Sequence, residues 1–216
     1  MKKKYLVAAT GIILVALFAG AALIYNKQKA EKISASAQKN VAYLQRDYSP
    51  SLGNPDAKVT IVEFFDPACG TCRAFHPFVK QLMSTYKGKI RLVHRYLPLH
   101  QGSDYVIKIL EAARLQNRYW ETLEAAFDAQ PVWASHDNPQ PERLWMRLGN
   151  VGLNFKKVRT SMESPEIAAR IRQDMADARQ LQVNKTPGFF VNGEPLITFG
   201  YEQLQTLVES EINKRY

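Results

Sequence analysis

Residues 59–72 read Val-Thr-Ile-Val-Glu-Phe-Phe-Asp-Pro-Ala-Cys-Gly-Thr-Cys, and this stretch decides the fold. Its first part, Val59–Phe65, is apolar at nearly every position, which is typical of a strand buried on both faces. Cys69 and Cys72 close the stretch and are the only cysteines in the chain. Apolar side chains at helical spacing follow them. The stretch therefore predicts a strand, a short loop and a helix that begins near Cys69.

A Cys-x-x-Cys pair at the start of a helix has a specific chemical use. The first amides of a helix point unpaired N–H groups at the first sulfur, here that of Cys69. Their partial positive charge stabilises a thiolate, which is the nucleophilic form and has a depressed pKa. Cys72 lies one helical turn further on, close enough to attack a mixed disulfide at Cys69 and release the partner. The pair is therefore interpreted as a redox-active disulfide that needs no bound cofactor.

Two other uses of a Cys-x-x-Cys pair are a structural zinc site and a structural disulfide. A closed structural zinc site needs four ligands, but the chain has no second cysteine pair and its histidines are scattered at positions 76, 94, 100 and 136. A purely structural disulfide between Cys69 and Cys72 would close a very short loop, which gives the least chain-entropy stabilisation. Position and spacing both favour redox chemistry over these two alternatives, and no metal is predicted.

The N-terminus reads as a membrane segment. Met1-Lys2-Lys3-Lys4 precedes a run, Tyr5–Tyr25, that contains no charged residue. Such a run approaches the ~20 residues that span a bilayer as a helix, and it is longer than the ~7–15 residues of a typical signal-peptide core. We expect an uncleaved anchor in a bacterial inner membrane. The alternative is a cleaved signal, because Ala19-Gly20-Ala21 offers a small-x-small site and a mature form would then begin near Ala22.

The charge of the chain does not indicate a nucleic-acid partner. The net charge is +9, but residues 1–32 hold six basic residues and one acidic residue. The remaining 23 basic and 19 acidic residues leave the rest of the chain at only +4. No basic stripe alternates with aromatic residues, as a nucleic-acid surface would require.

The rest of the chain reads as one globular domain behind a polar linker. We divide it into an anchor or signal (1–26), a linker (27–47), a first segment of the main domain (48–102), a helical insertion (103–182) and a final segment (183–216). Lys27–Asn40 within the linker reads as a tether or a short exposed helix. The expected elements are a helix over 69–87 kinked at Pro77, a strand over 90–97, a strand over 188–191, a hairpin turn at Asn192-Gly193, a returning strand over 195–199 and a helix over 201–215.

This order resembles the DsbA family of thiol:disulfide oxidoreductases, over roughly Leu52 to Tyr216. Residues 53–64, Gly-Asn-Pro-Asp-Ala-Lys-Val-Thr-Ile-Val-Glu-Phe, look like that family's first strand region. Residues 183–193, Val-Asn-Lys-Thr-Pro-Gly-Phe-Phe-Val-Asn-Gly, look like its proline loop and hairpin. The resemblance implies an α/β thioredoxin-like fold with an inserted α-helical domain, here preceded by an N-terminal transmembrane helix. Gly70-Thr71 departs from the family's more usual inter-cysteine pair, and those two residues tune the redox poise.

The resemblance also implies roles for individual residues. Cys69 is expected to be the exposed attacking thiolate and Cys72 the buried resolving thiol. Thr186-Pro187 resembles the cis-proline loop that lies against the cysteines and pairs with a client peptide; an ordinary trans turn is the alternative. Glu63 matches a buried acid that relays protons near the resolving thiol, although it could instead reach the surface or pair with a basic residue.

His76 and Lys185 are two further residues expected near the motif. His76, one turn beyond the second cysteine, reads more readily as a solvated surface histidine than as part of the site. Lys185 either adds positive potential near Cys69 or is simply a solvated loop lysine.

The resulting hypothesis is an envelope oxidoreductase that donates disulfides to client proteins and is recycled by a membrane partner of DsbB type. A cysteine pair that turns over disulfides on clients belongs in an oxidising compartment, so the domain is expected in the periplasm or outside the cell. One alternative is a reductase or isomerase kept reduced by a DsbD-type electron donor. Another is a Cu(I)-handling module that uses Cys69, Cys72 and His76, since Cu(I) favours thiolates.

Overall fold

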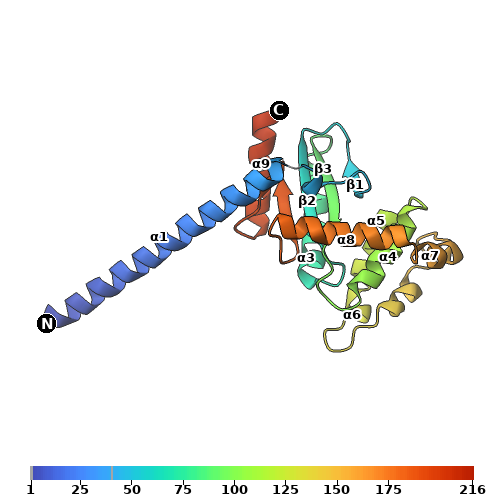
Figure 1. Cartoon of the computed structure of the whole chain (residues 1–216), viewed down its shortest axis with the longest axis horizontal. Coiled ribbons are helices and arrows are strands. Elements are labelled where there is room, and N and C mark those ends of the chain that lie inside the picture. Colours follow the sequence, from blue (N-terminus) through green and yellow to red (C-terminus); the bar gives the residue numbers. More distant parts are fainter. Residues whose placement is uncertain (1, 40) are drawn as a thin grey trace.

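The computed structural model describes residues 2–39 and 41–216, so that Met1 and Asn40 lie outside the described residues (Figure 1). In chain order the elements are α1 (Lys2–Lys39), α2 (Val41–Leu44), β1 (Ser51–Gly53), β2 (Val59–Phe65), α3 (Gly70–Thr85), β3 (Ile90–Tyr96), α4 (Ser103–Arg114), α5 (Tyr119–Asp128), α6 (Gln130–Trp133), the 3-10 helix η1 (Pro141–Arg147), α7 (Phe155–Ser161), α8 (Pro165–Gln180), β4 (Gly188–Val191), β5 (Glu194–Pro195) and α9 (Tyr201–Arg215).

The strands form one mixed sheet in the order β1-β3-β2-β4-β5. The central strands β2 and β3 are parallel, in register from Val59 opposite Ile90 to Phe65 opposite Tyr96. The helix α3 connects β2 to β3 in the chain, as expected for a β-α-β unit. The strand β4 adds antiparallel to β2 on its other side. Every residue of β2 except Thr60 is buried, which confirms the prediction of a strand covered on both faces.

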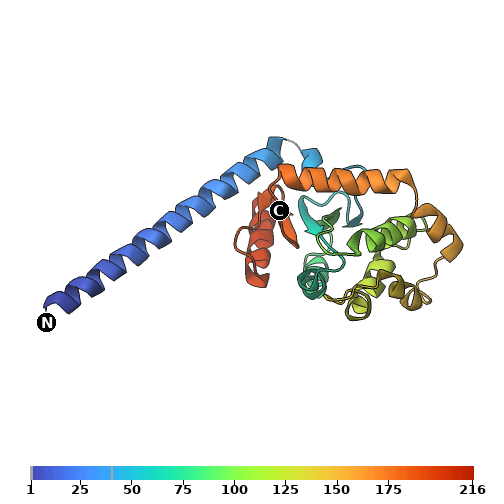
Figure 2. The ribbon, with the colours of Figure 1, turned by 60° about the horizontal axis from the view of Figure 1, so that its bottom comes forward.

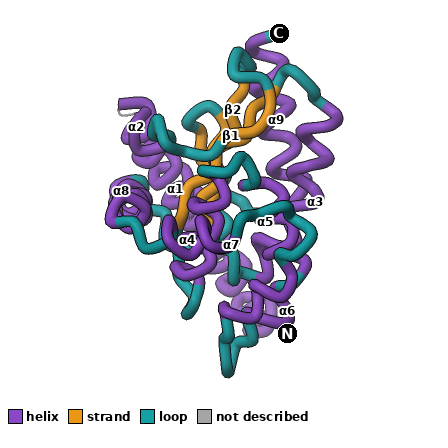
Figure 3. The backbone as a smooth tube through the Cα atoms, turned by 90° about the vertical axis from the view of Figure 1, so that its right-hand side faces the viewer, coloured by secondary structure: helices purple, strands orange, loops and turns teal. Residues whose placement is uncertain are grey.

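Helices cover both faces of this sheet. Phe75 of α3 and Leu204 of α9 pack with Ile61 and Leu92 on one face. On the other face, Ala178 of α8 lies in a cluster with strand residues and with the ends of α1 and α2. Figure 3 shows the strands between α3 and α9 on one side and α8 and α2 on the other. The resulting three-layer arrangement is the thioredoxin-like fold that the sequence predicted.

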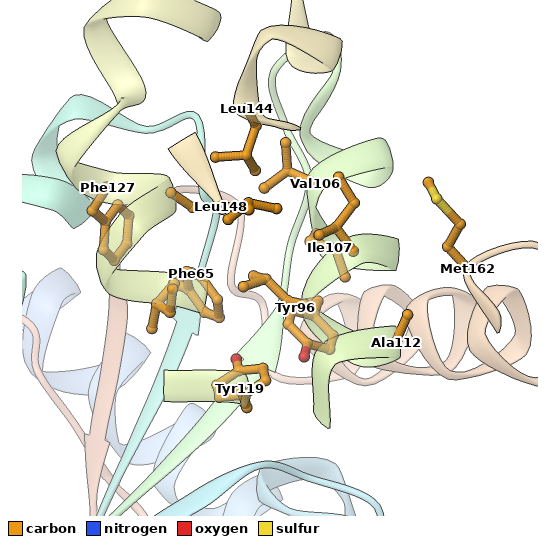
Figure 4. Close-up of a cluster of buried hydrophobic side chains, with 14 of the residues drawn as sticks. Phe65, Tyr96, Val106, Ile107, Ala112, Tyr119, Phe127, Leu144, Leu148 and Met162 are labelled. Atoms are coloured by element: carbon orange, nitrogen blue, oxygen red, sulfur yellow. The ribbon is translucent and has the colours of Figure 1, made fainter. Parts of the chain in front are cut away.

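The helices α4 to α8 lie between β3 and β4 in the chain and form the predicted helical insertion. Their core includes Val106, Ile107 and Leu144, which are fully buried. Phe65 and Tyr96, the last residues of β2 and β3, belong to the same cluster, as Figure 4 shows. The insertion therefore packs against the carboxyl ends of the two central strands, beside the start of α3.

The first helix, α1, extends well beyond the folded body in Figures 1 and 2. Its apolar side chains are largely exposed, for example Phe18 at 79% and Leu23 at 71%. Among the described residues, one helical stretch, Thr10–Lys39, is long and apolar enough to cross a membrane. The stretch expected to be a tether or a short exposed helix is helical over residues 27–39, as the continuation of α1, but its end is docked rather than exposed. Ile33 and Ala37 are buried against the sheet layer because they present an apolar face to it.

Several element boundaries differ from those expected. The helix predicted over 69–87 spans Gly70–Thr85, and the strand predicted over 90–97 ends at Tyr96. The returning strand predicted over 195–199 is only Glu194–Pro195. This strand is at the sheet edge, and proline lacks the N–H that would continue a ladder. One further bond, from the Leu196 amide to the Phe189 carbonyl at 2.9 Å, completes the hairpin.

Candidate active site

Cys69 caps the N-terminus of α3, directly beyond the loop that leaves β2. Its backbone is extended (φ −72°, ψ 119°), and no side chain caps the helix. The Cys69 amide donates to the Asp66 carbonyl at 3.0 Å, and the Cys69 carbonyl accepts from the Arg73 amide at 3.1 Å. The first amides of α3 are thus left for the Cys69 sulfur, as the sequence predicted. The two cysteines are free thiols in this structure.

The surroundings push the pKa values of the two thiols in opposite directions. A hydrogen bond from the Cys72 side chain is the largest influence on Cys69, and the pKa of Cys69 is lowered from 9.0 to about 5. Burial opposes this change, while hydrogen bonds from the Thr186 side chain and from the first helical amides support it. For Cys72, burial is the largest cause and raises its pKa well above the usual value, and the Glu63 charge adds to this.

One expectation about Cys69 is wrong, because its side chain is not openly exposed. Cys69 is 7% exposed and Cys72 is fully buried. The protonated Cys69 Sγ donates to the Thr186 carbonyl at 3.4 Å, and the Thr186–Pro187 peptide bond is cis. The proline loop therefore covers the sulfur from one side. Gly70 and Thr71 are exposed at the start of the helix.

A side chain from the helical insertion holds the other side of the loop. Gln130, at the start of α6, donates through Nε2 to the Pro67 carbonyl at 2.8 Å and to the Cys69 carbonyl at 3.0 Å. Both bonds are buried, so the amide satisfies two carbonyls that water cannot reach. Sequence reasoning missed this residue, because nothing near position 130 marks a partner some sixty positions earlier in the chain.

The second missed residue is Asp66, which is fully buried between β2 and the active-site loop. Its carboxylate accepts from the backbone amides of Ala68 at 2.8 Å and Leu99 at 2.7 Å. It also accepts from the His100 amide at 3.0 Å, and its Oδ2 lies 2.7 Å from His100 Nδ1. The Ser103 hydroxyl donates to the same carboxylate. Asp66 thereby ties the loop before Cys69 to the start of the insertion. A polar residue at the end of a buried strand was the available signal.

Glu63 is buried, at 3% exposure, in the middle of β2. Its Oε2 lies 3.4 Å from His94 Nε2, on the neighbouring strand β3. Burial lowers the pKa of His94, and the nearby Glu63 only partly offsets this effect. His94 is therefore a neutral neighbour at physiological pH, and not a charged partner. The carboxylate does not reach the surface, and it is close enough to Cys72 to act on its pKa.

His76 is buried in the structure, whereas Lys185 is exposed. The expectation of a solvated His76 is wrong: it is 8% exposed and its ring packs 5.1 Å from that of Phe127. Its Nε2 lies 3.1 Å from Glu124 Oε1, because the insertion covers this side of α3. Lys185 is exposed in the loop before Thr186. Among residues 2–39 and 41–216, no group of three or more His, Cys, Asp or Glu side chains is arranged to hold a metal ion.

An open cavity of about 540 Å³ lies beside the cysteine motif. The start of α3 contributes Gly70 and Arg73 to it, and the insertion contributes Gln130 and Pro131. The half-exposed His100, bound to Asp66, also lines it. The active-site edge of the sheet thus meets the insertion in a cavity with both polar and apolar walls.

Solved structures of other proteins share this fold. A thioredoxin-like oxidoreductase from Silicibacter pomeroyi is 33% identical, with a TM-score of 0.70 over 82% of this chain and 99% of that one. The thiol-disulfide exchange protein α-DsbA2 from Wolbachia pipientis is 22% identical and shares the fold, with a TM-score of 0.69 over 85% of this chain and 97% of that one.

Sequence comparison extends this picture to a different kind of protein. The Na(+)/H(+) antiporter NhaA of Herminiimonas arsenicoxydans is 28% identical over 144 residues, which are 67% of this chain and 22% of the antiporter. The chain therefore spans about a fifth of the length of this relative. The family model described as Thioredoxin matches residues 45–210. On the strength of that match and of the thioredoxin-like oxidoreductase from Silicibacter, this chain belongs to the thioredoxin family.

Proposed function

We propose that the chain donates disulfides to client proteins in the bacterial cell envelope through the Cys69–Cys72 pair. The observation that carries this proposal is the lowered pKa of Cys69, about 5. A thiolate stabilised in the folded, reduced protein makes the disulfide a better oxidant, because reduction then gains that stabilisation. The same thiolate is a good leaving group when a mixed disulfide is resolved by the client.

The proposed reaction begins with the Cys69–Cys72 disulfide and a client that carries two thiols. A client thiolate attacks Cys69 Sγ, the S–S bond breaks, and Cys72 leaves and takes up a proton. The client's second thiolate then attacks the client sulfur of the mixed disulfide, and Cys69 leaves as a thiolate. The client has lost two electrons and two protons. The cysteine pair has gained the two electrons and, at Cys72, one proton, and the other proton passes to solvent.

Groups around the pair are proposed to support the individual steps. Glu63 is proposed to pass a proton to and from Cys72, because Cys72 is fully buried and the Glu63 charge acts on its pKa. Thr186 is proposed to pair with the client backbone, since its carbonyl lies 3.4 Å from the reacting sulfur. Pro187 holds that loop in place, and Gly70 and Thr71 form the exposed edge that a client meets first.

A membrane partner is proposed to reoxidise the pair. The apolar helix α1 supports a single-pass location with the domain in the periplasm or outside the cell. A quinone-linked protein of DsbB type would supply the oxidant for a disulfide donor. A reductase would instead draw electrons from a partner of DsbD type.

The decisive experiment measures the reduction potential of the cysteine pair and its redox state in cells. Equilibration of the purified chain with glutathione buffers gives the reduction potential of the Cys69–Cys72 pair, and acid trapping of cells gives its redox state in vivo. A disulfide donor is expected to lie well above the ≈ −270 mV of thioredoxin and to be oxidised in cells. A potential near or below that of thioredoxin, with the pair reduced in cells, contradicts the proposal and favours the reductase.

A further inference from the structure

A second cavity, of about 520 Å³, lies between α1 and the end of α8, away from the one beside the cysteines. Its charged lining residues are Lys29 and Lys32 of α1 and Arg179 in the last turn of α8. The other lining residues are uncharged and include Tyr25, Gln182 and Asn184. The lining contains no Asp or Glu.

The three basic side chains are not neutralised within the part of the chain that the structure describes. None of them takes part in the ion pairs found there, whereas Arg95, which contacts α8, and Arg170 of α8 are paired. Arg95 lies 2.8 Å from Asp174, and Arg170 lies 2.9 Å from Glu111. Three like charges around one cavity repel each other unless an anion joins them. The charges of this cavity therefore suit a ligand with a negative group such as phosphate.

The position of the cavity along α1 identifies the source of that phosphate. The uncharged run ends at Tyr25, and tyrosine is favoured at the membrane–water interface. At a rise of about 1.5 Å per residue, Lys29 lies about 6 Å beyond Tyr25 and Lys32 about 10 Å beyond it. The headgroup layer adds about 5–7 Å on each side of the hydrocarbon core. Lys29 therefore lies within that layer and Lys32 just beyond it, where a long lysine side chain still reaches a headgroup.

Contacts further along α1 hold this helix to the folded body. Ser34 Oγ donates to Glu194 Oε1 at 3.1 Å, and Gln38 Nε2 donates to the same oxygen at 3.2 Å. Ile33 and Ala37 are buried against the domain. The helix therefore meets the folded body in a fixed arrangement just beyond the cavity.

We propose that this cavity binds the phosphate headgroup of an anionic phospholipid, and this inference rests on the membrane anchor of the proposed function. Asn184, in the cavity wall, is two residues before Thr186, whose carbonyl contacts Cys69 Sγ at 3.4 Å. With about 3.8 Å between consecutive Cα atoms, the reacting sulfur lies within roughly 14 Å of the Asn184 Cα. A bound headgroup would fix this loop and hold Cys69 close to the membrane surface, within reach of an embedded redox partner.

The test uses the full chain in lipid nanodiscs. One set contains phosphatidylcholine alone, and the other contains phosphatidylcholine with phosphatidylglycerol; lipid retained by the protein is measured by native mass spectrometry. The test variant combines Lys29→Gln, Lys32→Gln and Arg179→Gln. The control carries the same change of charge on exposed residues of the insertion, as Arg147→Gln, Lys156→Gln and Lys157→Gln.

The wild type and the control are expected to retain phosphatidylglycerol selectively. A basic side chain near an anionic surface contributes about fivefold to affinity, so the triple variant is expected to lose on the order of 100-fold. Equal retention of the two lipids, or equal losses in the test and control variants, overturns the proposal. Inorganic phosphate provides a further arm: if phosphate at millimolar concentration displaces the lipid completely, the site recognises a free anion and the assignment to lipid is wrong.

Failure of the proposed membrane anchor and failure of the lipid site give different results in this experiment. A chain that does not enter nanodiscs contradicts the anchor, and with it the lipid site. A chain that enters but shows no lipid selectivity contradicts the lipid site alone. The variant Cys69→Ser is expected to abolish disulfide exchange and to retain phosphatidylglycerol as the wild type does. Loss of lipid selectivity in this variant would contradict the separation of the two sites.

Discussion

The hydrogen bond from Cys72 is the largest cause of the low Cys69 pKa, and two substitutions at Cys72 isolate it. The variant Cys72→Ser retains a hydroxyl donor in place of the thiol. The variant Cys72→Ala removes the donor and leaves the helix amides and Thr186 as they are. Because position 72 is fully buried, water does not readily take the place of the missing donor.

The expected difference follows from the strength of a hydrogen bond to a charged group. Such a bond contributes about 1.5–3 kcal/mol, and one pKa unit corresponds to about 1.36 kcal/mol. The pKa of Cys69 is thus expected to stay near 5 in Cys72→Ser and to rise by roughly one to two units in Cys72→Ala. Both values remain below the ≈ 8.5 of an ordinary cysteine, because the helix amides still act on the sulfur.

The assay is the ultraviolet absorbance of the thiolate as a function of pH, checked by the pH dependence of the alkylation rate. The variant Cys69→Ser, which lacks the low-pKa sulfur, supplies the baseline. If the serine and alanine variants titrate at the same pH, Cys72 does not control the Cys69 thiolate and the reasoning fails. If both titrate near the ordinary cysteine value, the helix start contributes nothing and the assignment of Cys69 as nucleophile is lost.

Three further substitutions test the surrounding structure. Gln130→Leu leaves the buried Pro67 carbonyl without its donor, while the Cys69 carbonyl keeps the Arg73 amide, so urea unfolding should show a loss of stability of about 1–3 kcal/mol; an unchanged midpoint would contradict the buried bonds. Arg95→Met isolates the buried carboxylate of Asp174 and should cost about 3–5 kcal/mol at neutral pH, with a smaller loss in acid where carboxylates are protonated. Glu63→Gln removes a negative charge that raises the pKa of Cys72. In a Cys69→Ser background, Cys72 should therefore be alkylated faster at alkaline pH; an equal rate would mean that Glu63 does not affect the pKa of Cys72.

Local signals predicted the parts of the fold that depend on neighbouring residues. The apolar run at 59–65 is the central strand, and the cysteine pair starts a helix. Asn192-Gly193 is a hairpin turn, with φ values of 50° and 90° as a type I′ turn requires. Each of these features is set within a few residues of sequence, so the pattern alone is sufficient to predict it.

Features that depend on packing between distant segments were not visible in the sequence. The burial of Cys69 follows from the approach of Thr186 and Gln130, which lie more than a hundred and some sixty positions away. The contacts of Asp66 with the loop at 99–103 have the same origin. The sequence does not distinguish a docked Ile33 from one in an exposed tether or helix, because the residues around it in α1 are mostly polar.

The separation of the two thiol pKa values supports the proposed direction of exchange. Cys69 titrates near 5 in the folded, reduced protein and at 9.0 without the fold. Its thiolate therefore stabilises the reduced fold fully above pH 9, progressively less as the pH falls, and not at all below about 5. At pH 7 this amounts to at most about 2.7 kcal/mol, less where solvent screens the sulfur. That energy corresponds to roughly 60 mV of added oxidising potential. Cys72, with its raised pKa, stays protonated at pH 7 and adds nothing to this balance. The asymmetry that creates the nucleophile thus also favours passing the disulfide on to a client.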